Sequence, residues 1–127
     1  PANDAECALM EQWALFAATG IDGPALEILY TQTDGGDKTA EGQAAIAICA
    51  EKLRRPLARL QGQLDSSPFL IGGRFTVADI LVAECLRYAQ GHPSLLGEFP
   101  AVKAWLESCQ ARPAFQKMWA GRLAEPA

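Results

Sequence analysis

The sequence has little of what catalytic and metal sites usually require. Its only histidine, His92, lies in a Gly-His-Pro turn, with no cysteine or carboxylate at ligand spacing. No glycine-rich phosphate loop follows a strand pattern, and no Gly-x-Ser-x-Gly nucleophile motif is present. We therefore predict no metal site and no catalytic residue in this chain.

Positive charge and long apolar runs are scarce as well. The chain has 11 Lys and Arg against 15 Asp and Glu, a net charge of −4, which argues against nucleic acid or an anionic membrane as the main partner. No apolar run reaches transmembrane length, and no signal segment is recognisable. Four cysteines lie in predicted helices, none at metal-ligand spacing, so we expect reduced thiols and a cytoplasmic protein. They are Cys7, Cys49, Cys85 and Cys109.

Residues that favour strands are few. Val, Ile and Thr together supply 14 residues, whereas Ala alone supplies 23. Half of the residues are hydrophobic and a fifth are charged, which is the composition of a globular domain. We predict a single all-α domain over residues 1–127, built as a bundle of five or six helices around a central buried, capped helix.

The sharpest helix start lies in the stretch 72–86. Thr76 and Asp79 have the spacing of a capping box, in which each side chain accepts a hydrogen bond from the backbone of the other residue. Phe75 and Ile80 are placed as a hydrophobic staple across that turn. The helix that follows is apolar nearly all round, which predicts a central, buried element. We expect structural roles for these four residues.

Other helix signals divide the rest of the chain. The first helix begins at Asn3, is interrupted at Gly20 and Gly23-Pro24, and resumes over 25–30. A long helix is predicted over 39–64 with a kink at Pro56, and later helices open at Pro100 and Pro113. Residues 69–71 read as an extended buried connector.

Two features have alternative interpretations. The first helix has two apolar stripes, one with Trp13 and one with Met10, Ala14 and Ala17. One stripe packs in the core, and the other either packs too or contacts a ligand or a subunit. The basic row Lys52, Arg55 and Arg59 is either a solvated face or a contact for an acidic partner.

The stretch FLIGGRFTVADI, residues 69–80, resembles a characteristic segment of glutathione transferases. FPAVKAWL at 99–106 and ARPAF at 111–115 resemble that family's penultimate helix and the junction after it. The first half of the chain matches only by helix pattern and length. The resemblance implies the C-terminal helical domain of this family, in a form similar to bacterial members.

The resemblance implies a function shared with a second domain. The family binds glutathione, its co-substrate, mainly through an N-terminal thioredoxin-like domain, and no βαβ pattern of that kind is found here. We therefore expect this chain to be the part of a longer homodimeric enzyme that shapes the pocket for a small hydrophobic electrophile. The residues that the resemblance suggests for pocket or interface are Met10, Trp13, Ala14, Ala17, Tyr88 and Trp119.

Two other functions stay open at this point. Similar domains associate proteins in some translation-factor and synthetase assemblies, so the chain could be a free-standing association module without catalysis. It could also be a carrier that binds a small apolar molecule without chemistry. If the chain is part of a transferase, it should have no transferase activity alone. The coding sequence upstream of Pro1 separates that possibility from a free-standing module, and titration with apolar ligands tests the carrier.

Overall fold

The computed structural model describes residues 1–125, and within this range it contains seven α-helices, two short 3-10 helices and no β-strand. The all-α class is confirmed. The helix count exceeds the prediction because a one-turn helix after His92 was not predicted. The elements are α1 (Asp4–Gly20), α2 (Asp22–Thr33), η1 (Gly36–Lys38), α3 (Ala40–Leu64), α4 (Val77–Arg87), η2 (Tyr88–Gly91), α5 (Pro93–Gly97), α6 (Pro100–Gln110) and α7 (Pro113–Leu123).

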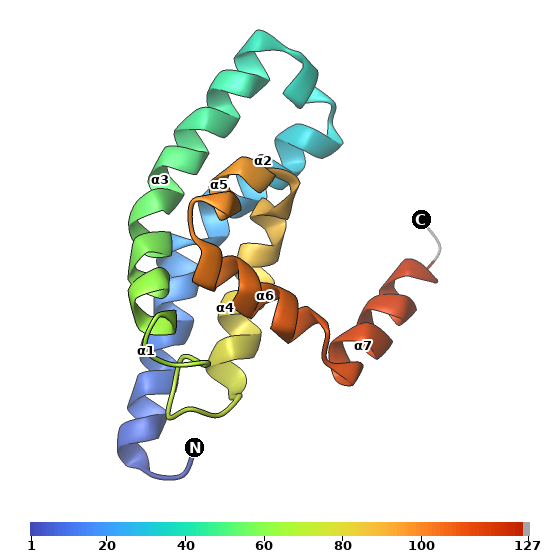
Figure 1. Cartoon of the computed structure of the whole chain (residues 1–127). Helices are drawn as coiled ribbons and strands as arrows, with labels where there is room; N and C mark the ends of the chain where they lie inside the picture. The colour runs from blue at the N-terminus through green and yellow to red at the C-terminus, as the bar shows by residue number, and fades with distance from the viewer. Residues whose placement is uncertain (126–127) are drawn as a thin grey trace.

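The helices form a bundle from which the last helix departs. α1 and α2 follow one another along the long α3, and α4 packs against α1, α2 and α6 (Figure 1). α7 leaves the bundle after α6 and stands apart from its body (Figure 1). In the described part of the chain, no helix is both long and apolar enough to span a bilayer.

Local caps start the helices where the sequence predicts them. Asn3 Oδ1 accepts the Glu6 N–H at 2.9 Å, and Thr39 Oγ1 accepts the Gly42 N–H at 3.1 Å. α6 and α7 each begin at a proline, whose missing N–H would have no partner in a first turn. These starts need no tertiary contact, so the sequence alone could indicate them.

The cap of α4 is also a junction between distant segments. The Thr76 N–H donates to Asp79 Oδ2 at 2.8 Å, and the Ala78 N–H donates to Thr76 Oγ1 at 3.3 Å, within the predicted capping box. Asp79 is fully buried, and its Oδ1 accepts the Leu70 N–H at 3.1 Å and the Trp105 Nε1–H at 3.0 Å. One carboxylate therefore joins α4, the connector and α6.

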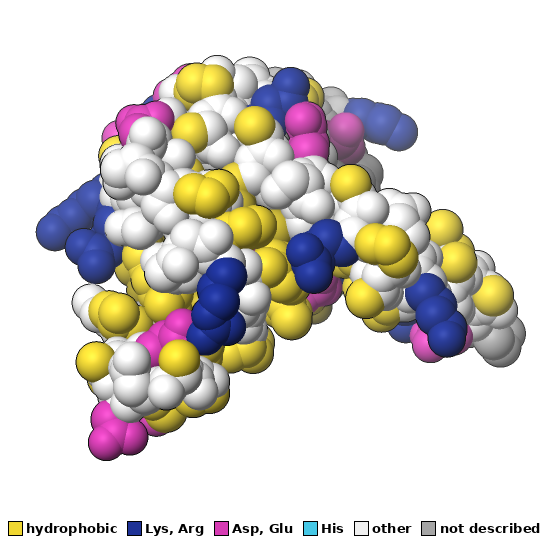
Figure 2. Space-filling view, turned by 60° about the horizontal axis from the view of Figure 1, so that its bottom comes forward, with side chains coloured by type: hydrophobic (Ala, Val, Ile, Leu, Met, Phe, Trp, Pro, Cys, Tyr) yellow, Lys and Arg dark blue, Asp and Glu magenta, His cyan; other side chains and the backbone are white. Residues whose placement is uncertain are grey.

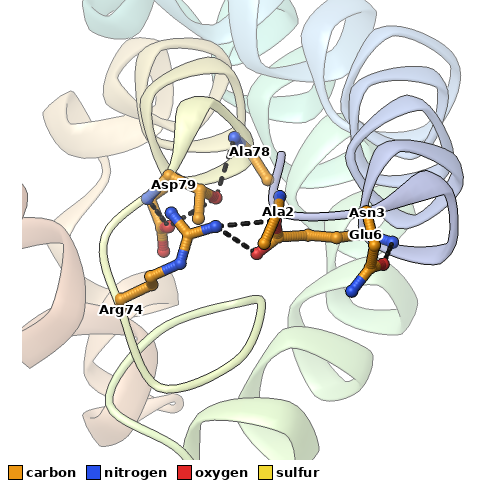
Figure 3. Close-up of polar contacts among 7 residues, drawn as sticks. Ala2, Asn3, Glu6, Arg74, Ala78 and Asp79 are labelled. Atoms are coloured by element: carbon orange, nitrogen blue, oxygen red, sulfur yellow. Dashed lines mark hydrogen bonds and ion pairs between the residues drawn. The ribbon is translucent and has the colours of Figure 1, made fainter.

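The connector before α4 is tied to the start of the chain. Leu70 is buried, while Gly72 and Gly73 adopt φ values of 62° and 70°, the left-handed region that glycine enters without strain. This turn presents Arg74, whose Nη2 lies 2.5 and 2.6 Å from the two carboxylate oxygens of Glu6 in α1 (Figure 3). The Ala2 N–H donates to the same carboxylate. The ion pair fastens the first turn of α1 to the loop that leads into α4.

α4 is apolar nearly all round and packs in the bundle core, as the sequence indicates, but only part of its circumference is buried. Its inner side is in the core, where Ala78, Val82 and Leu86 are fully buried. The other side is apolar but open, with Val77 46%, Ile80 53% and Leu81 41% exposed. The neighbours α1, α2 and α6 cover only part of the helix circumference. α4 therefore presents an apolar face outside the core.

Candidate functional site

A cleft of about 360 Å³ opens between α4, the end of α6 and α7. We name it the α4–α7 cleft. Hydrophobic side chains gather in the hollow between the body of the bundle and the projecting C-terminal arm (Figure 2). The cleft is lined by Phe75, Ile80, Ala83, Glu84, Cys109, Gln110, Arg112, Ala114, Phe115 and Met118. Its volume lies within the range of small-molecule sites.

The junction between α6 and α7 produces this cleft. Arg112 has extended backbone angles, φ −65° and ψ 138°, as expected for a residue before proline. Pro113 then begins α7 at once in a new direction. Gln116 Nε2 donates to the Gln110 carbonyl at 2.6 Å across the break. The two helices therefore diverge and leave the apolar face of α4 open between them.

Polar groups at the cleft are few. The Arg112 guanidinium lies 3.7 Å from the centroid of the Phe75 ring, a cation–π stack. Phe75 is held in turn by an edge contact with Phe69, at 6.0 Å between ring centroids. Burial, with the nearby Asp79 carboxylate, raises the pKa of the Cys109 thiol to about 12. That thiol is therefore neutral at physiological pH.

A second concavity, the basic groove, lies between α1, α2 and α3 and measures about 820 Å³. Trp13 and Phe16 meet edge to face in it, with ring centroids 5.3 Å apart. The Arg59 guanidinium lies 5.4 Å from the Trp13 ring centroid, and Lys52 and Arg55 also line the groove. The basic row is exposed and adjoins Trp13 and Phe16, and whether it is a solvated face or contacts a partner stays open.

Tyr88 and Trp119 are brought together elsewhere. The Arg87 guanidinium lies 4.7 Å from each of their ring centroids, in a groove between α2, α4 and α7. Glu84 accepts from the same guanidinium, at 2.5 Å from Nη2. The contact between Arg87 and Trp119 links α4 to α7.

The family model described as "Glutathione S-transferase, C-terminal domain" matches residues 7–113 of the chain. The chain belongs to this family. Its resemblance to glutathione transferases, noted first in residues 69–80 and 111–115, thus extends over most of its length.

The relatives of this glutathione S-transferase domain include glutathione S-transferases and elongation factor 1-gamma proteins. A glutathione S-transferase of Hyoscyamus muticus is 38% identical over 76 residues, which cover 58% of this chain and 36% of that protein. Elongation factor 1-gamma 2 of Oryza sativa subsp. japonica is 32% identical over 116 residues, 89% of this chain and 27% of that protein. The chain thus spans only about a third of the length of these relatives.

A solved structure supports the fold. Glutathione transferase F7 of Populus trichocarpa superposes with a TM-score of 0.81 at 26% identity, over 94% of this chain and 58% of that one. These three relatives are from plants, so the expected similarity to bacterial members is not supported.

The residues predicted for pocket or interface do not form one site. Met10, Trp13 and Ala17 lie in the core, 8%, 6% and 1% exposed, and Ala14 is half-buried. Trp13 also lines the basic groove, and Tyr88 and Trp119 line the groove between α2, α4 and α7. None of the six lines the α4–α7 cleft. Their role in a pocket or an interface stays a prediction.

The sequence did not predict the residues that line the α4–α7 cleft as a binding site. Phe75 and Ile80 were predicted as a staple, and both line the cleft. The signal that could have indicated it is the second apolar side of α4, since an all-round apolar helix can also present one face to a ligand. In residues 1–125 no group of three or more His, Cys, Asp or Glu could hold a metal ion. The four cysteines are free, and Cys7 is exposed.

Proposed function

We propose that the chain is the helical domain of a glutathione transferase and that its α4–α7 cleft forms part of the pocket for a small hydrophobic electrophile. The observation that carries this proposal is the open apolar side of α4, where Ile80, 53% exposed, lines the cleft with Phe115 and Met118 of α7. Large apolar residues gathered beside a concavity are typical of a ligand or domain contact. Membership of the family supplies the reaction class.

The proposed reaction divides the work between two domains. The glutathione thiolate attacks the electrophilic carbon, a C–S bond forms, and the leaving group departs with its electron pair. In our proposal the groups that lower the thiol pKa belong to a thioredoxin-like domain that accompanies this one. The present chain contributes apolar walls that hold the electrophile and exclude water, and none of its residues is assigned a catalytic role.

We also propose that the complete protein is a cytoplasmic homodimer and that the basic groove contributes to its interface. The groove is lined by the half-buried Phe16 and the edge of the buried Trp13, beside the exposed cations Lys52, Arg55 and Arg59. Aromatic and arginine side chains are enriched at protein interfaces. This arrangement accords with the role expected for the first helix.

A neutral fluorescent probe tests the pocket. N-phenyl-1-naphthylamine should bind the protein, and Ile80→Asp should weaken that binding about tenfold or more, because it puts a charge in an apolar wall. Ile48→Asp is the matched control, since Ile48 is 58% exposed on α3 and lies outside the cleft. Absence of probe binding, or equal losses in both variants, would refute the proposed pocket.

Catalysis gives an independent test. The chain alone should not conjugate glutathione to 1-chloro-2,4-dinitrobenzene, since the proposed thiol-activating groups lie in the other domain. In a protein that carries both domains, Ile80→Asp should raise KM for the electrophile and leave KM for glutathione unchanged. Conjugation by the 127-residue chain would contradict this division of roles.

A second candidate is a protein-association module. It is favoured by the match to an elongation factor, which covers 89% of the chain, against 58% for the match to the Hyoscyamus transferase. For such a module the basic groove would be the working surface, and the α4–α7 cleft would bind no probe. Probe binding that depends on Ile80 therefore favours the transferase.

A further inference from the structure

Another concavity, which we name the η1 pocket, lies at the end of the bundle where α2 turns into α3, opposite the first turn of α1 (Figure 1). It measures about 510 Å³ and shares no residue with the α4–α7 cleft or with the basic groove. Its walls come from α2, η1, α3 and the turn after η2, which contributes His92. The proposed function uses none of its residues.

Two glycines hold Asp37 at this pocket. A Cβ at Gly42 would lie 2.1 Å from the Gly36 carbonyl oxygen, and a Cβ at Gly36 would lie 2.9 Å from the Thr31 side chain. Only glycine therefore lets η1 lie so close to α2 and to the first turn of α3. Thr39 Oγ1 also donates to the Gly36 carbonyl at 2.9 Å. These contacts fix the backbone that carries Asp37.

The Asp37 carboxylate has no partner within residues 1–125. Its Oδ1 is the one buried side-chain polar atom in this range that makes no hydrogen bond, and no Lys or Arg side chain pairs with it. Native proteins leave few buried acceptors without a donor, because such groups are unfavourable. The terminal torsion of aspartate is soft, so a small rotation turns either oxygen toward the pocket. The carboxylate is therefore available to a cationic donor that enters the pocket.

Two amide side chains add acceptors beside this carboxylate. Gln32 Nε2 donates to the Gly91 carbonyl at 2.7 Å. Gln43 Nε2 donates to the Asp37 carbonyl at 3.1 Å. Because a carbonyl oxygen only accepts, it fixes which end of each amide faces it, and the two amide oxygens remain as acceptors. A primary ammonium group carries three N–H donors, which equals the number of these acceptor groups.

The other residues of the pocket do not repel a cation. Among the described residues that line it, only Arg54 is a Lys or Arg, and it pairs with the carboxylates of Glu51 and Glu98, the latter at 3.0 Å. Ile46 and Ala50 add apolar surface from α3. A pocket with an unpaired carboxylate and an apolar wall is complementary to a short aliphatic chain that ends in an ammonium group.

We propose that the η1 pocket binds small aliphatic primary amines in their ammonium form and that Asp37 is the residue that recognises the ammonium group. Gln32 and Gln43 accept its remaining N–H donors. This site goes beyond the proposed function and is separate from the α4–α7 cleft, so either can fail without the other.

The single histidine of the chain reports on this pocket, because His92 lines it. In proton NMR spectra at fixed pH, the ring signals of His92 should shift as n-butylammonium is added, with a Kd of about 1 mM or below. n-Butyltrimethylammonium carries the same charge without N–H donors, and 1-butanol carries the same chain without the charge. Each of these should bind about tenfold or more weakly.

Asp37→Asn keeps the size of the side chain but removes its charge and one acceptor. It should weaken n-butylammonium binding about tenfold or more, because a charge-assisted hydrogen bond is lost. Asp34→Asn is the matched control, since Asp34 is exposed and lies outside the pocket. Gln43→Met removes one acceptor at similar length and should weaken binding by a smaller factor. The urea midpoint should not fall in Asp37→Asn, because Oδ1 accepts no hydrogen bond in the native fold.

The outcomes are decisive for Asp37. The absence of any shift of the His92 signals up to about 10 mM n-butylammonium would overturn the site. Equal binding of n-butyltrimethylammonium or of 1-butanol would overturn recognition of the ammonium N–H groups. An Asp37→Asn variant that binds as tightly as the wild type, or an equal loss in Asp34→Asn, would overturn the role of Asp37. Binding of N-phenyl-1-naphthylamine is independent of all these results and tests the α4–α7 cleft separately.

Discussion

The Asp79→Asn substitution tests how far the stability of this fold depends on a single buried carboxylate. Asp79 is fully buried and accepts from the Leu70 N–H, the Thr76 N–H, the Trp105 Nε1–H and the Thr76 hydroxyl. Three of these four groups are N–H donors, which cannot turn round to accept. The Asp79→Asn variant keeps the size and shape of the side chain but replaces one acceptor oxygen with a donor.

The structure allows the cost to be worked out. If the amide nitrogen replaces Oδ1, it faces two N–H groups, from Leu70 and Trp105. If it replaces Oδ2, it faces the Thr76 N–H and a hydroxyl that can reorient. The second orientation is cheaper, and it loses one charge-assisted bond and leaves one buried N–H unsatisfied. Each effect is worth about 1–3 kcal/mol, so we expect a loss of about 3 kcal/mol in unfolding free energy.

Urea unfolding followed by circular dichroism measures this loss. The variant should remain folded, because domains of this size have unfolding free energies of about 5–15 kcal/mol. Trp105→Phe removes one donor and should cost about 1–2 kcal/mol. Asp34→Asn, the same chemical change at an exposed site, should stay within about 0.5 kcal/mol of the wild type.

Two results would refute the reasoning about Asp79. One is a loss below about 0.5 kcal/mol in Asp79→Asn, which would mean that the junction rearranges at little cost. The other is a large fall in affinity for N-phenyl-1-naphthylamine in variant protein that is still folded, because Asp79 does not line the cleft. Either result would show that its main role is not structural.

Two further predictions concern alkaline stability and assembly. Burial raises the pKa of Cys109 from an ordinary 9.0 to about 12, so the unfolded thiol ionises first. Its contribution to stability is complete below pH 9 and is lost as the pH rises toward 12, by at most about 1.4 kcal/mol per pH unit. Urea midpoints should show a shallower alkaline fall in Cys109→Ala, and an identical fall would contradict the shift. In sedimentation equilibrium the proposed dimer should dissociate about tenfold more readily in Arg55→Glu, which reverses a charge in the basic groove, than in the control Lys117→Glu. A wild type that is monomeric at every concentration would refute that interface.

The parts of the fold that the sequence predicts are those stabilised within one helical turn. Asn3, Thr39 and Thr76 each bond a backbone N–H two or three residues ahead, so their spacing alone indicates a helix start. Pro100 and Pro113 act through their own backbone geometry. Such signals are complete in a short window and do not depend on what packs against the helix.

The candidate site could not be predicted in the same way, because distant segments make it. The direction of α7 is set at Arg112 and Pro113, and no local pattern states the angle at which it leaves α6. The Trp105 bond to Asp79 spans 26 residues and joins two helices. An apolar residue such as Ile80 has the same periodic signal whether its side faces a core or a cleft.

The two sides of α4 suggest that stability and binding are separable in this domain. Asp79 and Ile80 are adjacent in the sequence but about 100° apart around the helix, so one lies in the core and the other lines the cleft. A change at Ile80 alters surface that is already 53% exposed and should cost little stability. A change at Asp79 leaves buried N–H donors without an acceptor and does not alter the cleft wall. A segment without catalytic residues therefore has two separate roles, since Asp79 stabilises the fold and Ile80 supplies a wall of the proposed pocket.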